Sequence, residues 1–177
     1  MGQAKLENKK IGILGGSFDP AHKGHIRISK VAKKNHNLNQ VIWAVTKKNP
    51  FKKNKSDNLE KRISYAKKIN EKNKFIKVKC FEKIINSNRT VDLIKYLKKK
   101  FQDTEIFFLM GADNLINFHK WKDYKIITKL CIILVFDRTG YKSKALTSKS
   151  YIKYNKKHIK FIKFNKVNIS SSQLRKI

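Results

Sequence analysis

The chain has 177 residues, 40% of them hydrophobic, a length and composition that suit one domain with a substantial core. It carries 43 lysines and arginines against 12 aspartates and glutamates, which gives a formal net charge of +31. No apolar run approaches membrane-spanning length, and the first residues lack the apolar core of a signal peptide, so we predict a cytoplasmic protein without a membrane partner.

The positive charge comes almost entirely from lysine. Five of the 43 cations are arginines, and the other 38 are lysines spread along the chain among many asparagines. An A+T-rich genome favours these two residue types at tolerant surface positions, whereas a dedicated polyanion site gathers cations into one stripe. We therefore interpret the charge as solvated surface that attracts anionic substrates, and predict no specific nucleic-acid partner. A lysine-rich nucleic-acid-binding module remains the alternative from another class of protein.

Two cysteines occur in apolar, strand-like runs. Cys80 and Cys131 are too few and too far apart for a disulfide framework or a typical metal site. We predict that both are buried free thiols of a cytosolic protein.

Strand and helix patterns alternate after a polar leader, residues 1–10, and predict a single domain over residues 11–177. Near-continuous apolar strands separated by helices predict an α/β fold with a mainly parallel sheet covered by helices on both faces. The expected strands are Ile11–Leu14, Gln40–Thr46, Phe75–Phe81, Glu105–Met110, Cys131–Phe136 and His158–Phe164. The expected helices are Lys23–Asn35, Leu59–Asn70 capped by Asp57, Thr90–Phe101, Ala112–Phe118, Tyr124–Leu130, a weak helix near Leu146–Tyr154, and a last one from Ser170.

Ligands of such sheets bind beyond the carboxyl ends of the strands. Four segments follow expected strand ends and should converge on one cleft. They are Gly15–His25, Thr46–Lys53, Gly111–Trp121 and Asp137–Gly140.

The first of these segments has the features of a phosphate-binding loop. A strand and the pair Gly15-Gly16 lead into His22-Lys-Gly-His25 and then into a helical pattern. Glycine allows close approach of backbone to a ligand, and a helix start offers N–H groups and a positive dipole end. Two histidines at i and i+3 can donate to the same phosphate. The glycine spacing fits neither a Walker loop nor a dinucleotide fingerprint. An ordinary strand-to-helix turn with two surface histidines is the alternative.

The segment from Gly111 to Trp121 combines a tight exit from a strand with an acid and an aromatic ring. Asp113 stands at a helix start, where its carboxylate can cap the helix or accept hydrogen bonds from ribose hydroxyls. Trp121 offers a flat face for a planar ring, worth about 1–3 kcal/mol per base-like ring. Its alternative role is that of a core tryptophan.

The segment Asn168-Ile-Ser-Ser-Ser-Gln-Leu-Arg175 places small hydroxyl residues at a helix start with an arginine one turn later. This arrangement predicts a second anion site. The alternative is a plain helix cap with a surface arginine.

These segments resemble known family signatures. The first is similar to the His-x-Gly-His element of the nucleotidyltransferase superfamily. Gly-x-Asp-x-Leu-x-x-Phe-x-x-Trp is similar to the substrate-binding segment of bacterial nicotinate-nucleotide adenylyltransferases, and Ile169 to Arg175 resembles their Ile-Ser-x-Thr/Ser-x-x-Arg element. Weaker resemblances are Asn49-Pro-Phe-Lys52, Asn88-Arg-Thr-Val-Asp92 and Asp137-Arg-Thr-Gly140.

The resemblance implies a Rossmann-like fold and the transfer of AMP from ATP to nicotinate mononucleotide, which yields deamido-NAD and pyrophosphate. It implies Mg²⁺ bound through the ATP phosphates, with no metal ligand from the protein. Nicotinamide-mononucleotide and phosphopantetheine adenylyltransferases remain alternatives, and the oligomeric state is not predicted. The implied catalytic residues are His22, His25 and Arg175. The implied ATP-binding residues are Gly15, Gly16, Ser17, Phe18, Gly24, Lys52, Gly111, Asp113, Arg138, Ile169, Ser171 and Ser172. The implied mononucleotide-binding residues are Thr90, Trp121 and Lys122.

Overall fold

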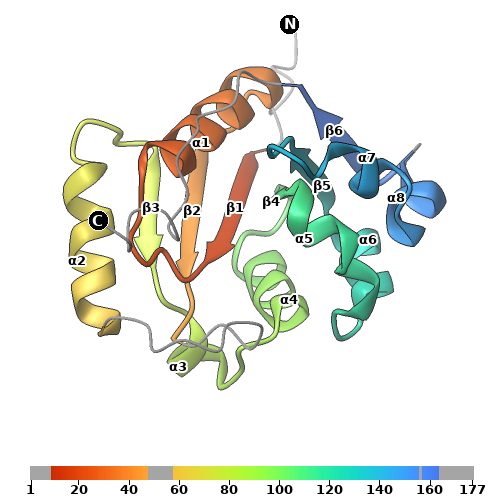
Figure 1. The fold of residues 1–177 in the computed structure, drawn as a ribbon. Helices are drawn as coiled ribbons and strands as arrows, with labels where there is room; N and C mark the ends of the chain where they lie inside the picture. Colours follow the sequence, from red (N-terminus) through yellow and green to blue (C-terminus); the bar gives the residue numbers. More distant parts are fainter. Residues whose placement is uncertain (1–8, 48–57, 156, 164–177) are drawn as a thin grey trace, which may run out of the picture.

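The computed structural model describes residues 9–47, 58–155 and 157–163. Six strands of this part form one sheet, in which every neighbouring pair is parallel. This arrangement confirms the predicted α/β fold with a parallel sheet. The strands are β1 (Lys10–Gly16), β2 (Gln40–Val45), β3 (Ile76–Lys79), β4 (Glu105–Gly111), β5 (Ile132–Phe136) and β6 (Ile159–Ile162), in the sheet order β3-β2-β1-β4-β5-β6 (Figure 1).

Helices connect the strands and cover both faces of the sheet. α2 lies beside β3, whereas α5 to α8 gather around β5 and β6 (Figure 1). The helices are α1 (Lys23–His36), α2 (Leu59–Ile69), α3 (Glu82–Ile85), α4 (Thr90–Lys100), α5 (Ala112–Ile116), α6 (Tyr124–Leu130), α7 (Lys142–Leu146) and α8 (Lys149–Tyr154), with a 3₁₀ turn at Phe118–Lys120.

Side chains alternate across the strands and divide the core into two clusters. On one face, Leu14, Trp43 and Leu109 pack with residues of α1 and α2; we call this the α1 face. On the other, Ile13 and Phe108 pack with residues of α4, α5 and α6; we call this the α4 face. Burial on both faces explains why the four central strands, β2, β1, β4 and β5, are nearly continuous apolar runs.

Two helices each bury one face against the sheet. In α4, Val91, Ile94 and Leu97 are fully buried, and Phe101 packs partly buried against the same cluster. In α2, the face that contains Ala66 packs on the α1 face of the sheet.

Helix boundaries differ from the prediction where caps and turns intervene. The N-cap of α2 is Asn58, whose side chain accepts from the Glu60 N–H, so the predicted Asp57 cap is wrong. Ser148 caps α8 by accepting from the Tyr151 N–H, so the weak helix predicted over 146–154 is divided between α7 and α8. The short helix α3 was not predicted at all.

The two cysteines flank strands and do not lie within them. Cys131 is buried, and burial raises the pKa of its thiol to about 12. Cys80 is only half-buried, so the prediction that it is buried is wrong. Both cysteines are free thiols, as predicted.

In the part of the chain described by the structure, no helix is long and apolar enough to cross a membrane.

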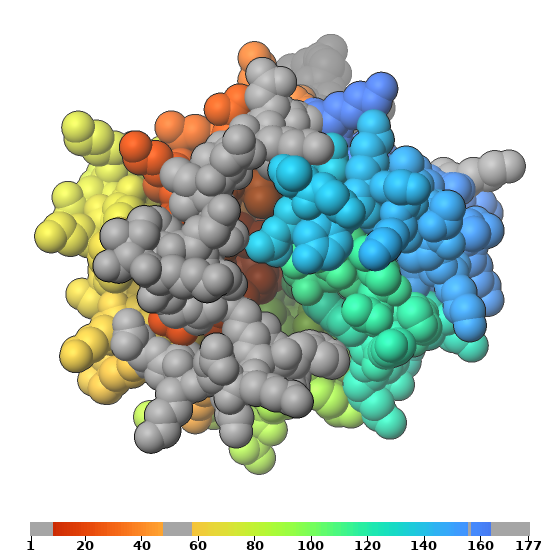
Figure 2. All heavy atoms as spheres, viewed as in Figure 1, coloured from red at the N-terminus to blue at the C-terminus, as the bar shows by residue number. Residues whose placement is uncertain are grey.

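The order of strands reverses between β1 and β4. From β1 the chain proceeds outward to β2 and β3, then returns to pair β4 with the other side of β1. Ligands of open parallel sheets bind beside such a reversal, at the carboxyl ends of the strands. Figure 2 shows the two halves on the surface, with yellow atoms of α2 on one side and green to blue atoms of α5 to α8 on the other.

Gly12 of β1 provides a test of packing on the α1 face of the sheet. A Cβ atom there would lie 2.9 Å from Leu38 Cδ1 and 3.2 Å from side-chain carbons of Val41 and Leu109. We expect Gly12→Ala to lower the free energy of unfolding by about 1–3 kcal/mol, since the buried neighbours must move. Gly15→Ala is the matched control, because its Cβ would meet Phe108 at an ordinary 3.6 Å. Equal denaturant midpoints for wild type and Gly12→Ala would contradict the packing argument.

Candidate active site

The glycine loop after β1 takes an uncommon backbone course. Phe18 has a positive φ of 47°, a conformation that L side chains rarely adopt and that must be stabilised from outside. Its ring is buried and stacks on Trp43 of β2, with centroids 4.8 Å apart and planes 13° apart. The side chain of Phe18 is therefore part of the core, and Phe18 can line a ligand site only with its backbone.

The two histidines form a capping box at the start of α1. Nδ1 of His22 accepts the Gly24 N–H at 3.1 Å, and Nδ1 of His25 accepts the His22 N–H at 3.1 Å. The rings lie together, with centroids 3.8 Å apart. An Nδ1 that accepts a hydrogen bond carries no proton, so each neutral ring carries its proton on Nε2. Both imidazoles can therefore act as Nε2–H donors, as phosphate binding requires.

A buried hydrogen-bond chain fixes the helix turn that carries His25. Trp43 Nε1 donates to Ser29 Oγ at 2.9 Å, and Ser29 Oγ donates to the His25 carbonyl at 2.9 Å. Ser29 is fully buried between α1 and β2. The first turn of α1 is thus positioned by the sheet and not by its sequence alone.

His22 is neutral at physiological pH. Burial, and next the positive charge of Arg138, lower its pKa from 6.5 to about 4. The effect of Arg138 also shows that the segment after β5 lies close enough to act on the histidine pair. The predicted convergence of the Gly15–His25 and Asp137–Gly140 segments is supported by this interaction.

Asp113 and Arg138 pair with each other across the site. Arg138 Nη1 donates to Asp113 Oδ2, and the guanidinium also lies 5.8 Å from the centre of the Tyr141 ring. A Cβ atom on Gly111 would overlap Asp113 Oδ1, so the glycine at the end of β4 leaves the space that this carboxylate occupies. Asp113 makes no cap bond to α5, which leaves its predicted role toward a ligand open.

Trp121 lies between the core and the site. Its ring meets Phe108 and Phe118 edge to face, at centroid distances of 6.1 and 5.4 Å, and is half-buried against the α4-face cluster. Phe108 in turn is the side chain that a Cβ on Gly15 would meet. Trp121 therefore does pack on the core. Its ring is also separated from the glycine loop only by the ring of Phe108.

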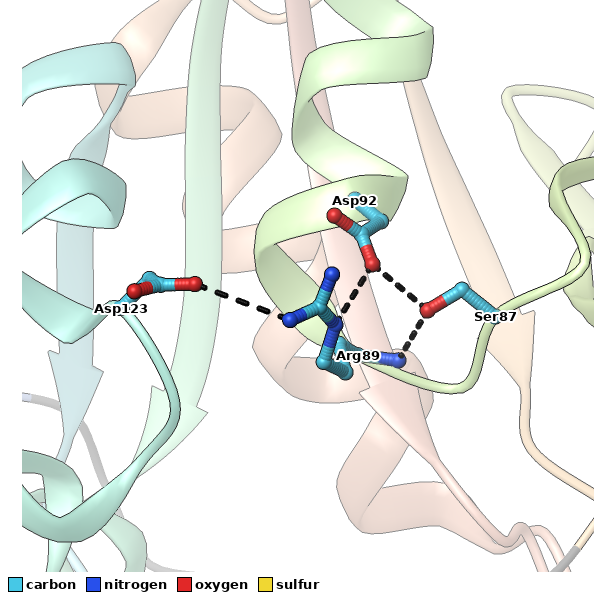
Figure 3. A network of polar contacts seen from close by, with 4 residues as sticks. All are labelled: Ser87, Arg89, Asp92 and Asp123. Atoms are coloured by element: carbon cyan, nitrogen blue, oxygen red, sulfur yellow. Dashed lines mark hydrogen bonds and ion pairs between the residues drawn. The ribbon is translucent and has the colours of Figure 1, made fainter.

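A polar network joins the segments that carry Thr90 and Trp121. Ser87 Oγ donates to Asp92 Oδ2 at 2.6 Å, and Arg89 Nε donates to the same oxygen at 2.7 Å, while Arg89 Nη1 lies 3.8 Å from Asp123 (Figure 3). The Ser87 hydroxyl, and then the Arg89 guanidinium, lower the pKa of the Asp92 carboxyl. Thr90 is the first residue of α4, so its backbone belongs to a helix start.

Arg62 of α2 was not predicted as a site residue, yet it is 3% exposed and holds the carboxyl ends of two strands. Its guanidinium donates to the carbonyl of Ser17 at 2.5 Å and to those of Thr46 and Lys47 at 2.9 Å each. Two features of the sequence could have identified Arg62. It lies on the α2 face that also carries Ala66, and it is an arginine in a chain that otherwise prefers lysine.

The remaining predicted residues divide into three groups. The Gly24 N–H is bonded to His22, so Gly24 can only contribute through close approach of its backbone. Lys122 is exposed next to Trp121. Lys52, Ile169, Ser171, Ser172 and Arg175 lie outside the described residues, and their roles stay predictions.

The pKa of His22 makes a testable contribution to stability. The unfolded chain binds a proton at His22 as the pH falls through 6.5, whereas the folded protein binds it only near pH 4. Wild type should therefore lose stability in this window relative to His22→Asn, which keeps a side-chain acceptor at the cap. Melting temperatures of both proteins, from about pH 7.5 to about pH 4.5, measure the difference. Parallel pH profiles of the two proteins would show that the folded His22 titrates normally.

Comparison with known proteins places this geometry in a family. A family model described as cytidylyltransferase-like matches residues 13–177. A probable nicotinate-nucleotide adenylyltransferase of Pelagibacter ubique is 61% identical over 168 residues, which cover 95% of this chain and 93% of the relative. One of Aquifex aeolicus is 32% identical over 168 residues, covering 91% and 98%.

Solved structures agree in fold. The Plasmodium falciparum nicotinic acid mononucleotide adenylyltransferase complexed with NaAD matches with a TM-score of 0.78 at 21% identity, over 95% of this chain and 83% of that one. The same enzyme complexed with APC matches with a TM-score of 0.76 over the same shares. The chain belongs to the cytidylyltransferase-like family and, within it, to the nicotinate-nucleotide adenylyltransferases.

Proposed function

We propose that the protein transfers AMP from ATP to nicotinate mononucleotide and releases pyrophosphate, a step of NAD biosynthesis. The observation that carries the proposal is the histidine pair at the start of α1, which follows β1 at the reversal of strand order. Nδ1 of each ring accepts a hydrogen bond, so each neutral ring carries its proton on Nε2. The names of the relatives at 61% and 32% identity support the choice of acceptor.

The chemistry requires alignment more than a protein nucleophile. The phosphate of the mononucleotide is already an anion and attacks the α-phosphorus of ATP, while the bond to the leaving pyrophosphate breaks. His22 and His25 would donate Nε2–H hydrogen bonds to phosphate oxygens, and the N-terminus of α1 would add its positive dipole. A neutral His22 donates without a change of protonation state, so it would serve as a hydrogen-bond donor and not as an acid or base.

The ATP side of the site would lie between α1 and α5. The backbone of Gly16 to Phe18 would line the nucleotide, and Asp113 would accept hydrogen bonds from ribose hydroxyls through the oxygen that Arg138 does not hold. Arg138 would then border the adenine. The Asp113–Arg138 pair would pre-orient both groups before ATP arrives.

The acceptor side would lie between the start of α4 and Trp121. The pyridine ring would stack on Trp121, and its carboxylate would meet backbone N–H groups near Thr90 together with the charge of Lys122. In nicotinamide mononucleotide an amide replaces the carboxylate, and its NH₂ group would meet these donors without accepting a hydrogen bond. The unsatisfied donors would weaken binding by about 1–3 kcal/mol.

Mg²⁺ is the divalent ion we expect with ATP. Within residues 9–47, 58–155 and 157–163, no three His, Cys, Asp or Glu side chains come together as a metal site. A site rich in cations and N–H donors, with Asp113 already paired, fits an ion held by phosphate oxygens and water. Such an ion would neutralise charge on the phosphates.

Pyrophosphate release with a panel of acceptors tests the function. Purified protein with ATP and Mg²⁺ is given nicotinate mononucleotide, nicotinamide mononucleotide or phosphopantetheine in turn. We expect kcat/KM for the nicotinate form to exceed that for the nicotinamide form by about tenfold or more, because the amide leaves donors unsatisfied.

Two further results define the boundaries of this test. His25→Ala, with its fold verified by circular dichroism, should lower kcat by about 100-fold, as expected for the loss of one preorganised donor.

If no acceptor gives pyrophosphate release, the protein is not an adenylyltransferase of these acceptors. Tight, steeply salt-dependent nucleic-acid binding would then favour the lysine-rich nucleic-acid-binding module.

Gly111→Ala should weaken ATP binding without lowering the stability of the fold. The new methyl group would displace the Asp113 carboxylate, a movable side-chain end, while Gly111 itself has ordinary extended backbone that alanine can adopt. We expect KM for ATP to rise by about tenfold to 150-fold, the range for losing a hydrogen bond to a charged group, with little change in melting temperature. Unchanged KM for ATP would show that Asp113 does not bind the nucleotide.

A further inference from the structure

Arg62 makes contacts that go beyond those of an ordinary buried side chain. It reaches from α2 to the carboxyl edge of the sheet, where β1 and β2 end side by side and the Thr46 N–H still donates to the Gly16 carbonyl at 3.0 Å. From there its guanidinium donates to three main-chain carbonyls of two separate segments. One is the glycine loop, and the other leads out of β2.

We infer that Arg62 is a positioning residue that orients the Ser17–Phe18 peptide for binding the ATP phosphates. This inference rests on the proposed function. In a trans peptide the C=O and the N–H point in opposite directions. Because the Ser17 oxygen is bound by Arg62, the Phe18 N–H is turned away from α2, on the side opposite the guanidinium.

The backbone at this peptide requires such a restraint. The positive φ of Phe18 is unfavourable for a residue with a side chain. The ring of Phe18 stacks on Trp43 and lies 4.8 Å from the ring of His25, and these contacts fix the side chain. The Arg62 hydrogen bond at the preceding carbonyl fixes the direction of the peptide dipole.

The planar fork of arginine explains the residue type. One nitrogen, Nη1, donates to both Ser17 and Thr46, and the other, Nη2, donates to Lys47. A lysine ammonium keeps the charge but has a single nitrogen, so it cannot bind the Ser17 and Thr46 carbonyls as Nη1 does and also reach the Lys47 carbonyl from a second nitrogen. The arrangement also keeps the spacing between the glycine loop and the end of β2 constant.

Arg62→Lys tests the inference with two readouts. Calorimetric titration with a non-hydrolysable ATP analogue and Mg²⁺ measures binding, and pyrophosphate release measures turnover. We expect ATP affinity and kcat each to fall by about tenfold, consistent with misaligned charged hydrogen bonds, while KM for the mononucleotide changes little. If Arg62→Lys does not fold, Arg62→Gln, which keeps a donor without the charge, replaces it in both measurements.

Two controls isolate the positioning role. Arg27→Lys makes the same chemical change at an exposed position of α1 and should match wild type in all measurements. Leu97→Val removes a buried methylene group from α4 and lowers stability without touching the glycine loop. Its kcat and its affinity for the ATP analogue, corrected for the folded fraction, should stay at wild-type values.

Two outcomes would overturn the inference. One is wild-type ATP affinity in a folded Arg62 variant. The other is an equal loss toward ATP and mononucleotide that follows the drop in melting temperature, as a purely structural role would give. Absence of adenylyl transfer by the wild-type protein would instead refute the proposed function, and the calorimetric result would still decide whether Arg62 acts on nucleotide binding.

Discussion

The parallel pairing of β1 with β4 is the constraint on which the site depends. It places two strands that end in glycine side by side where the order of strands reverses, with Leu14 opposite Leu109 in the register. Chains leaving these two strands go to opposite faces of the sheet, one to α1 and the other to α5. The histidine pair and Asp113 are thereby placed at two helix starts beside the same reversal of strand order.

Guanidinium groups hold the segments around this space. Arg62 joins the ends of β1 and β2, Arg138 joins the segment after β5 to Asp113, and Arg89 joins the starts of α4 and α6. Each bridges two segments distant in sequence, and the geometry of the fork suits this role better than a lysine ammonium. Arg62, Arg89 and Arg138 therefore mark positions of this lysine-rich chain where the direction of hydrogen bonding matters.

Binding groups of the site also serve the fold. The Nδ1 atoms of His22 and His25 cap α1, and this same use determines that Nε2 carries the proton. Trp121 packs on Phe108 and Phe118 of the core in edge-to-face pairs and stands near the glycine loop. Side chains with two roles are rigid before a ligand arrives, which lowers the ordering cost of binding.

The sequence by itself determined the α/β class, all six strands and both histidines as a pair, because hydrophobic periodicity and glycine-histidine spacing are local signals. It did not determine the cap at Asn58, the division of α7 from α8, or the half-exposure of Cys80. Competing caps a residue apart are nearly equal in local energy, so packing selects between them.

Only the tertiary structure decided which distant residues meet. The pairing of Asp113 with Arg138 and the reach of Arg62 to the glycine loop, across 45 positions of sequence, depend on the order of strands in the sheet. Periodicity carries no information about the order of the four central strands, β2, β1, β4 and β5, since each is buried on both faces alike. Local sequence patterns thus identify the residue types that the site needs, whereas the order of strands in the sheet decides which of these residues contact one another.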